Sequence, residues 1–221
     1  AENPEIERIY CAPGNGGISV QATPVDIKAT DVEGMVAFAK KEGIDFAVVT
    51  PDDPLVLGMA DAMEEAGVPA FGPSKKAAQI EGSKVFAKNL MKKYGIPTAK
   101  YKVFDDPGKV VEYIERENCF PAVIKADGLA LGKGVVIAKN LEEAKEAVHS
   151  IMEDKIFGKS GNQVVVEEFL TGKEVSVLAF ADGKTVRPMV SSKDHKRALD
   201  GNKGLNTGGM GTISPNPYYD E

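Results

Sequence analysis

Apolar runs and amphipathic segments alternate along the first 80 residues of the chain. Apolar residues recur at helical spacing between Asp31, which can cap a helix, and Gly43, which can end one. The apolar run 46–50 predicts a buried strand, the segment 54–66 a second helix, and the run 68–71 another strand. This strand, helix, strand order predicts a parallel, doubly wound sheet.

The alternation continues beyond residue 80 and then fades. Asn140, followed three residues later by Glu143, forms a capping box that predicts the start of a helix. The other predicted elements are helices at 83–94 and 107–117, strands at 101–104, 122–126, 164–166 and 174–181, and a turn at Asp182 and Gly183. Residues 192–221, rich in glycine, asparagine and lysine, are predicted to be loop-like.

We therefore expect an α/β protein in four parts. A doubly wound domain covers residues 1–80, and a connecting helix with its linker covers residues 81–101. A small two-layer α/β module follows at residues 102–165. The last part, residues 166–221, is β-rich and is expected to be incomplete.

Composition narrows the class of protein. A chain of 221 residues with 43% hydrophobic and 27% charged residues is typical of a soluble globular protein. The net charge of -6 disfavours a nucleic-acid partner, and no apolar run approaches the ~18 to 20 residues of a membrane span. Cys11 and Cys119 are too few for a disulfide scaffold, and His149 and His195 complete no zinc spacing. A cytoplasmic location fits best.

The stretch 121–138 places glycines and lysines between two apolar runs, which suggests phosphate binding. It is not the familiar phosphate loop, because Gly128 to Lys133 is one residue short and β-branched residues rather than helix formers follow. A phosphate would therefore bind under a loop that joins two strands. Lys125 shares a strand face with Val123, so the loop can fold over it. A plain glycine hairpin with a solvated lysine is an equally good interpretation of this stretch alone.

Two further stretches suggest ligand contacts. The acidic run 167–170 follows a valine-rich strand, where backbone groups could pair with adenine while Glu174 holds ribose hydroxyls. The segment 191–197 carries lysines and an arginine, and the glycines of 206–211 allow backbone to approach an anion. Taken alone, each is more often a solvated strand end or a flexible surface loop. We expect His195 to be structural.

Taken together, these stretches resemble the phosphoribosylamine–glycine ligases, a family of the ATP-grasp superfamily. The resemblance runs from about residue 13 to the last residues and rests most on 194–215, which reads Asp-His-Lys-Arg and then Asn-Thr-Gly-Gly-Met-Gly-Thr-Ile-Ser-Pro. It implies a Rossmann-like N-terminal domain, an ATP-grasp lid at 102–165 and the start of the C-terminal ATP-grasp subdomain at 166–221.

The resemblance also implies roles for individual residues. The nucleotide phosphates would meet two lysines and the loop that closes over them, and the acidic run would line adenine and ribose. The implied ATP-binding residues are Lys84, Lys125, Asp127, Gly128, Gly132, Lys133, Gly134, Glu167, Glu168, Phe169, Leu170 and Glu174. The residues implied to face glycine and 5-phosphoribosylamine are Asp194, Lys196, Arg197, Asn206, Thr207, Gly208, Gly209 and Met210.

The chain departs from the family pattern in three places. The opening strand and helix of the family's first domain are missing, and residues 50–55 differ from the usual sequence of a substrate loop. The family's glutamate and asparagine that hold Mg²⁺ or Mn²⁺ are expected beyond residue 221. We therefore expect a fragment that lacks both ends, that is inactive on its own, and that forms a monomer or a weak homodimer.

The implied reaction activates the carboxylate of glycine with the γ-phosphate of ATP. The amine of phosphoribosylamine then attacks the glycyl phosphate to give glycinamide ribonucleotide, and no protein nucleophile is required. Another ATP-grasp ligase, such as a carboxylase subunit, and a non-catalytic nucleotide-binding module remain as alternatives. A dinucleotide oxidoreductase is disfavoured, because no GxGxxG joins a strand to a helix.

Overall fold

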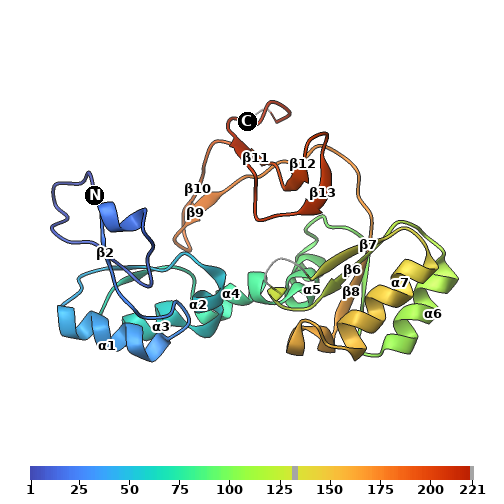
Figure 1. Ribbon diagram of the computed structural model, residues 1–221, viewed down its shortest axis with the longest axis horizontal. Helices are drawn as coiled ribbons and strands as arrows, with labels where there is room; N and C mark the ends of the chain where they lie inside the picture. Colours follow the sequence, from blue (N-terminus) through green and yellow to red (C-terminus); the bar gives the residue numbers. More distant parts are fainter. Residues whose placement is uncertain (131–133, 220–221) are drawn as a thin grey trace.

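The computed structural model describes residues 1–130 and 134–219 of the chain (Figure 1). The first domain contains two parallel strand pairs. Strand β1 (Tyr10–Cys11) pairs with β2 (Thr23–Pro24), and β3 (Ala47–Val48) pairs with β4 (Ala70–Phe71). The predicted parallel pairing is present, but in the described residues the pairs form two separate sheets.

Four α-helices accompany these strands: α1 (Val32–Glu42), α2 (Asp52–Leu57), α3 (Met59–Glu65) and α4 (Lys75–Gly82), with a 3₁₀ turn at Ile18–Val20. As predicted, Asp31 caps α1 by accepting a hydrogen bond from the Gly34 N–H, and Gly43 ends the helix in the left-handed conformation. The single helix predicted over 54–66 is wrong. Gly58, with φ of 98°, breaks it into α2 and α3.

The strand predicted over 46–50 is shorter and less buried than expected. Val49 is buried, but Val48 is 63% exposed and Phe46 is 57% exposed. The only strand that pairs with β3 in the described residues is β4, so one edge of this short strand lacks a neighbouring strand. Helix α4 was not predicted, although Ser74 caps it by accepting a hydrogen bond from the Ala77 N–H.

The second module is an antiparallel sheet in the order β5-β8-β6-β7. Its strands are β5 (Tyr101–Phe104), β6 (Ala122–Ala126), β7 (Val135–Ala138) and β8 (Val164–Glu168). Its helical segments are α5 (Lys84–Tyr94), α6 (Pro107–Glu117), α7 (Leu141–Val148), a π-helical turn (His149–Glu153) and a 3₁₀ turn (Gly158–Asn162). The predicted strands 101–104 and 122–126 and the predicted helix 107–117 are confirmed.

Strand alternation divides this sheet into two faces. Ile124 of β6 and Val164 of β8 are fully buried in the core formed with α6 and α7. Lys125 and Glu167 alternate with these core residues and so lie on the opposite face, the one that α5 approaches along β8. One face therefore supplies the core of the module, and the other carries Lys125 and Glu167. Helices α6 and α7 lie on one side of the sheet and α5 on the other (Figure 1).

The last part consists of short strands: β9 (Ala179–Ala181), β10 (Val186–Pro188), β11 (Lys193–Asp194), β12 (Arg197–Leu199), β13 (Lys203–Asn206) and β14 (Thr212–Ile213). They form three antiparallel pairs, β9 with β10, β11 with β14 and β12 with β13. The loop-like prediction for 192–221 is therefore wrong, and the predicted strand 174–181 shrinks to β9 and an isolated bridge at Ser176. Over the described residues, no helix is long and apolar enough to cross a membrane.

Candidate functional site

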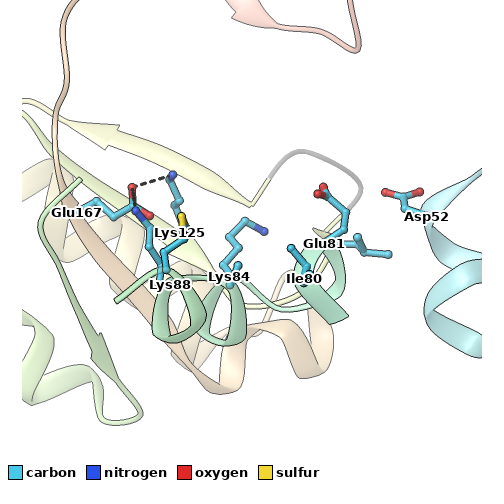
Figure 2. Close-up of a pocket in the computed structure, with 10 residues that line it drawn as sticks. Asp52, Ile80, Glu81, Lys84, Lys88, Lys125 and Glu167 are labelled. Atoms are coloured by element: carbon cyan, nitrogen blue, oxygen red, sulfur yellow. Dashed lines mark hydrogen bonds and ion pairs between the residues drawn. The ribbon is translucent and has the colours of Figure 1, made fainter. Parts of the chain in front are cut away.

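An open pocket of about 330 Å³ lies between α5, the charged face of the sheet and the first domain (Figure 2). Its charged lining comes from elements far apart in the sequence. These residues are Asp52 of α2, Glu81 of α4, Lys84 and Lys88 of α5, Lys125 of β6, and Glu167 of β8. The predicted residues Lys84, Lys125 and Glu167 are thus brought together.

The start of α5 is tied to the end of β6, which fixes Lys84 beside Lys125. Ser83 caps α5 by accepting a hydrogen bond from the Phe86 N–H. The carboxylate of Asp127 accepts hydrogen bonds from the Ser83 hydroxyl at 3.0 Å and from the Val85 N–H at 3.1 Å. The structure therefore gives Asp127 a structural role at the helix start and not a position in the pocket lining.

The side chain of Lys84 extends from the start of α5 toward the end of β6. Its ammonium group donates a hydrogen bond to the carbonyl oxygen of Gly128, at the beginning of the glycine-rich loop. Partial burial lowers the pKa of Lys84 below its usual value of 10.5, and neighbouring Lys125 lowers it further, whereas Asp127 acts in the opposite direction. Two ammonium groups, those of Lys84 and Lys125, therefore lie close enough in the pocket lining to influence each other.

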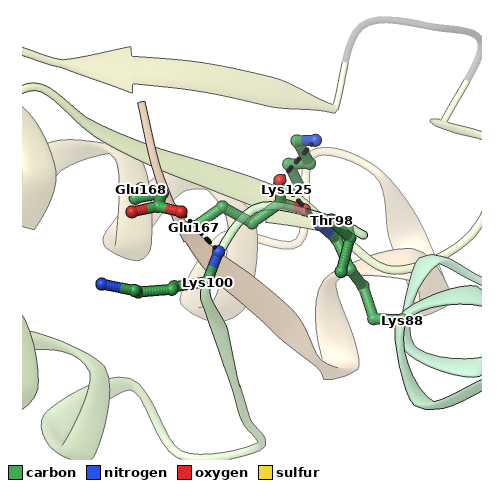
Figure 3. A network of polar contacts seen from close by, with 6 residues as sticks. All are labelled: Lys88, Thr98, Lys100, Lys125, Glu167 and Glu168. Atoms are coloured by element: carbon green, nitrogen blue, oxygen red, sulfur yellow. Dashed lines mark hydrogen bonds and ion pairs between the residues drawn. The ribbon is translucent and has the colours of Figure 1, made fainter. Parts of the chain in front are cut away.

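The second lysine is held by a buried carboxylate (Figure 3). Lys125 Nζ lies 3.0 Å from Glu167 Oε2, and Lys88 Nζ lies 3.2 Å from the same oxygen. Glu167 Oε1 is buried and has no hydrogen-bond partner. The solvated lysine and the solvated strand end considered from sequence are therefore both wrong for Lys125 and Glu167.

Lys88 is the site residue that sequence reasoning missed. It is 7% exposed, donates a hydrogen bond to Thr98 Oγ1 at 2.7 Å, and lies 5.5 Å from the centre of the Tyr101 ring. A usable signal was its position four residues after Lys84, because residues so spaced share one face of a helix. Its burial follows from the packing of α5 against β8, and no local sequence pattern indicates that packing.

The glycine-rich loop is closely packed where it is described. Gly128 has φ of 90°, and a Cβ there would lie 2.5 Å from Ser160 Oγ. A Cβ on Gly134 would lie 2.7 Å from the Cβ of Ala130. These two positions accommodate only glycine without rearrangement. The predicted ligand residues Gly132 and Lys133 lie outside the described residues.

The acidic run is divided by strand alternation. Glu168 turns away from Glu167, and its Oε1 accepts a hydrogen bond from the Lys100 N–H at 2.8 Å (Figure 3). Phe169 and Leu170, which follow the strand, are 41% and 64% exposed. The two predicted adenine-lining residues are therefore accessible, whereas the side chain of Glu168 joins β8 to the segment before β5.

Glu174 lies with a different group of residues from the one expected. The antiparallel bridge between Ser176 and Ser192 sets a register that places Glu174 opposite Asp194. Lys196 Nζ lies 2.5 Å from Asp194 Oδ2, and this contact holds the pKa of Asp194 below its usual value and raises that of Lys196. The predicted ribose ligand thus belongs to the predicted substrate cluster, and it does not line the pocket.

The remaining predicted substrate residues lie in the β12–β13 hairpin or in the loop that follows it. Arg197 donates a hydrogen bond to the Gly204 carbonyl at 2.6 Å, and Thr207 Oγ1 donates to the Lys196 carbonyl at 2.8 Å. Gly209, with φ of 132°, donates its N–H to Thr207 Oγ1. A Cβ on Gly208 or Gly209 would meet nothing within 4 Å, and Met210 is 62% exposed. The side chain of Asn206 lies outside the described residues.

No group of three His, Cys, Asp or Glu side chains able to hold a metal ion occurs within residues 1–130 and 134–219. The expectation that Mg²⁺ or Mn²⁺ ligands lie beyond residue 221 stays a prediction. The same is true of the predicted inactivity and oligomeric state.

A glycine-rich loop between two antiparallel strands, lysines from the sheet and a preceding helix, and a carboxylate on the neighbouring strand together define a protein of the ATP-grasp class. Residues 82–221 match the family described as phosphoribosylglycinamide synthetase, ATP-grasp (A) domain, and residues 1–81 match its N domain. The chain belongs to the phosphoribosylglycinamide synthetase family. The predicted fold class, an N-terminal domain followed by an ATP-grasp domain, is thereby confirmed.

Similar proteins give the same family. A phosphoribosylamine–glycine ligase of Clostridium acetobutylicum is 50% identical over 221 residues, which are 100% of this chain and 53% of that protein. The crystal structure of the same ligase from Thermotoga maritima has a TM-score of 0.76 and 34% identity, and the match covers 93% of this chain and 49% of that one. The chain therefore spans about half the length of the relatives it matches.

More distant structures share the fold alone. The biotin carboxylase domain of 2-oxoglutarate carboxylase from Hydrogenobacter thermophilus, solved in complex with MgADP, has a TM-score of 0.69 at 17% identity. The match covers 86% of this chain and 45% of that one.

Proposed function

We propose that this chain supplies the nucleotide pocket and part of the acceptor site of an ATP-dependent ligase that joins glycine to 5-phosphoribosylamine. The product is glycinamide ribonucleotide, an intermediate of purine biosynthesis. The observation that carries the proposal is the convergence of Lys84 and Lys125 on one pocket beside Glu167, in a chain whose whole length matches this family.

The pocket suits a nucleoside triphosphate. Lys84 and Lys125 offer two ammonium groups to the phosphates, and the loop that begins at Gly128 offers backbone. The accessible segment at 169–170 and the unpartnered Glu167 Oε1 provide acceptors and apolar surface for the base. The distant biotin carboxylase domain binds MgADP, which supports nucleotide binding in this fold.

In the proposed reaction a carboxylate oxygen of glycine attacks the γ-phosphorus of ATP, and the bond to the β-phosphate oxygen breaks to release ADP. The amine of phosphoribosylamine then attacks the carbonyl carbon of glycyl phosphate, an amide bond forms, and inorganic phosphate leaves. The described lysines act by positioning phosphates and neutralising their charge. Mg²⁺ or Mn²⁺ bound with ATP would add to the neutralisation of phosphate charge, and its protein ligands are expected beyond residue 221.

The second group of residues fits the acceptor end of the reaction. Asp194 and Lys196 form a charged pair beside Glu174, and the loop from Thr207 to Met210 exposes backbone at glycines without close neighbours. Such backbone can approach the phosphate or the carboxylate of a small substrate. We assign glycine and phosphoribosylamine to this cluster.

Steady-state ADP release by the full-length enzyme that contains this chain tests the proposal, because it should require both glycine and phosphoribosylamine. Gly209→Val should raise the KM for at least one acceptor substrate and leave that for ATP unchanged. Gly183→Val is the matched control, because Gly183 also has positive φ and no neighbour within 4 Å but lies in the β9–β10 turn. ADP release that needs neither acceptor would contradict the function. A rise in the KM for ATP alone would contradict the placement of the loop.

A further inference from the structure

One feature of the pocket is not explained by phosphate binding alone: two lysines share a single oxygen of a buried carboxylate (Figure 3). Lys125 is the more accessible of the two, with a side chain 27% exposed against 9% for Lys88. Both line the same pocket as Glu167. The two cations are thus chemically alike but differ in how freely they can move.

Lys88 is fixed from several sides. Its ammonium group donates to Thr98, pairs with Glu167 and faces the ring of Tyr101, and its stem is buried on α5. For Lys125, in contrast, the only hydrogen-bond or ion-pair partner of the side chain among the described residues is Glu167. A ligand that attracts a lysine from this pair would therefore move Lys125 and leave Lys88 in place.

Moving Lys125 has an electrostatic consequence. Glu167 is buried, and a buried carboxylate that loses its counter-ion is strongly unfavourable. A phosphate group that engages Lys125 would impose this penalty unless another cation stayed beside Glu167. Lys88 already lies 3.2 Å from the same oxygen, so it can carry the pairing alone.

We propose that Lys88 is a positioning residue that keeps Glu167 paired while the nucleotide phosphate draws Lys125 away. By holding Oε2, it also keeps the unpartnered Oε1 available to an N–H donor of the ligand. This inference rests on the proposed nucleotide site. It assigns the two lysines different roles. Lys125 binds the phosphate, and Lys88 keeps Glu167 paired with a cation when Lys125 moves away.

The test compares ATP with adenosine, which has no phosphate to engage Lys125. Calorimetry would give the ATP affinity of the chain, and displacement by ATP would give that of adenosine.

Lys88→Met removes the ammonium and keeps the bulk of the side chain. It should weaken ATP binding about tenfold, by analogy with the loss of one charge-assisted contact, and change adenosine binding less than about twofold. Lys92→Met, one helical turn further on at an exposed site, is the control and should change neither affinity.

A double-mutant cycle separates this role from direct contact with phosphate. In a Glu167→Gln background there is no buried charge to neutralise, so adding Lys88→Met should change ATP affinity by less than about twofold. If Lys88→Met does not fold, Thr98→Val keeps the charge but releases the lysine. It should cause a smaller loss, in ATP binding only.

Each other outcome would overturn the inference. Equal losses for ATP and adenosine would indicate general damage to the pocket, and the same loss with and without Glu167 would indicate direct contact between Lys88 and phosphate. No loss in either variant would show that Glu167 needs only one lysine. The proposed function fails separately: an unsubstituted chain that binds no ATP would overturn both, whereas ATP binding weakened by Lys125→Ala but not by Lys88→Met would overturn the inference alone.

Discussion

The sheet of β5 to β8 and the hairpins after residue 168 carry the two halves of the proposed site, but they are held together differently. Ile124, Ile151 and Val164 are fully buried between the sheet and its helices. Among the described residues of 169–219, only Ser191 and Asn216 are buried, and both are polar. Asn216 joins two chain segments by donating to the carbonyls of Glu174 and Ser192.

The difference concerns how each half fixes its geometry. In the sheet, apolar burial on one face sets the positions of charged groups on the other, so Lys125 and Glu167 are placed by the core beneath them. In the hairpins, hydrogen bonds and the Asp194–Lys196 pair hold the cluster while apolar residues such as Leu178 and Phe180 remain exposed. The most distinctive sequence of the chain thus lies in a part that buries no apolar side chain among its described residues.

The largest expected effect is on the free energy of unfolding, and it is tested by replacing one apolar residue in each region. Ile124→Ala should destabilise the chain by about 2 to 5 kcal/mol, because it removes a fully buried side chain. Leu199→Ala, in the exposed β12, should change stability by less than about 0.5 kcal/mol. Urea unfolding measures both. Similar losses would mean that the hairpins depend on apolar burial as much as the sheet does.

A glycine pair sharpens the comparison. A Cβ at Gly161 would lie 2.0 Å from the backbone oxygen of Ile151, so Gly161→Ala should cost about 1 to 3 kcal/mol through overpacking. Gly208→Ala meets nothing within 4 Å and should be close to neutral. The melting temperatures of the two variants measure this difference. A Gly161→Ala variant as stable as the unsubstituted chain would contradict the close packing around Gly161.

The smallest expected effect is on the pH dependence of ATP affinity. Because burial lowers the pKa of Lys84 below 10.5, this ammonium loses its proton at a lower pH than an exposed lysine. ATP affinity should therefore fall as the pH rises through that lowered pKa. Lys84→Arg keeps its charge and should flatten the decline that the unsubstituted chain shows below pH 10.5. Identical pH profiles for the two proteins would exclude Lys84 as the titrating contact.

Local signals explain what the sequence predicted well. The predicted caps at Asp31 and Asn140 lie at the starts of α1 and α7, and the strand of alternating faces at 122–126 is β6. Each depends on neighbouring residues only, which makes it visible in one sequence.

Long-range pairing explains what the sequence could not predict. The insertion of β8 between β5 and β6 brings Glu167 to Lys125, 42 residues away. The bridge at Ser176 moves Glu174 to Asp194 in the same way. The burial of Lys88 depends on how α5 docks. None of these contacts leaves a local pattern, so the members of each cluster were recognisable but their grouping was not.

The central claim is that the packed sheet positions Lys125 for nucleotide phosphate, and calorimetry with ATP tests it most directly. Lys125→Ala should weaken ATP binding by about 1.5 to 3 kcal/mol, the contribution of one charge-assisted contact, with an unchanged melting temperature because Lys88 still pairs with Glu167. Lys139→Ala, at an exposed site beyond β7, should bind ATP as the unsubstituted chain does. Unchanged ATP affinity in Lys125→Ala would contradict the claim.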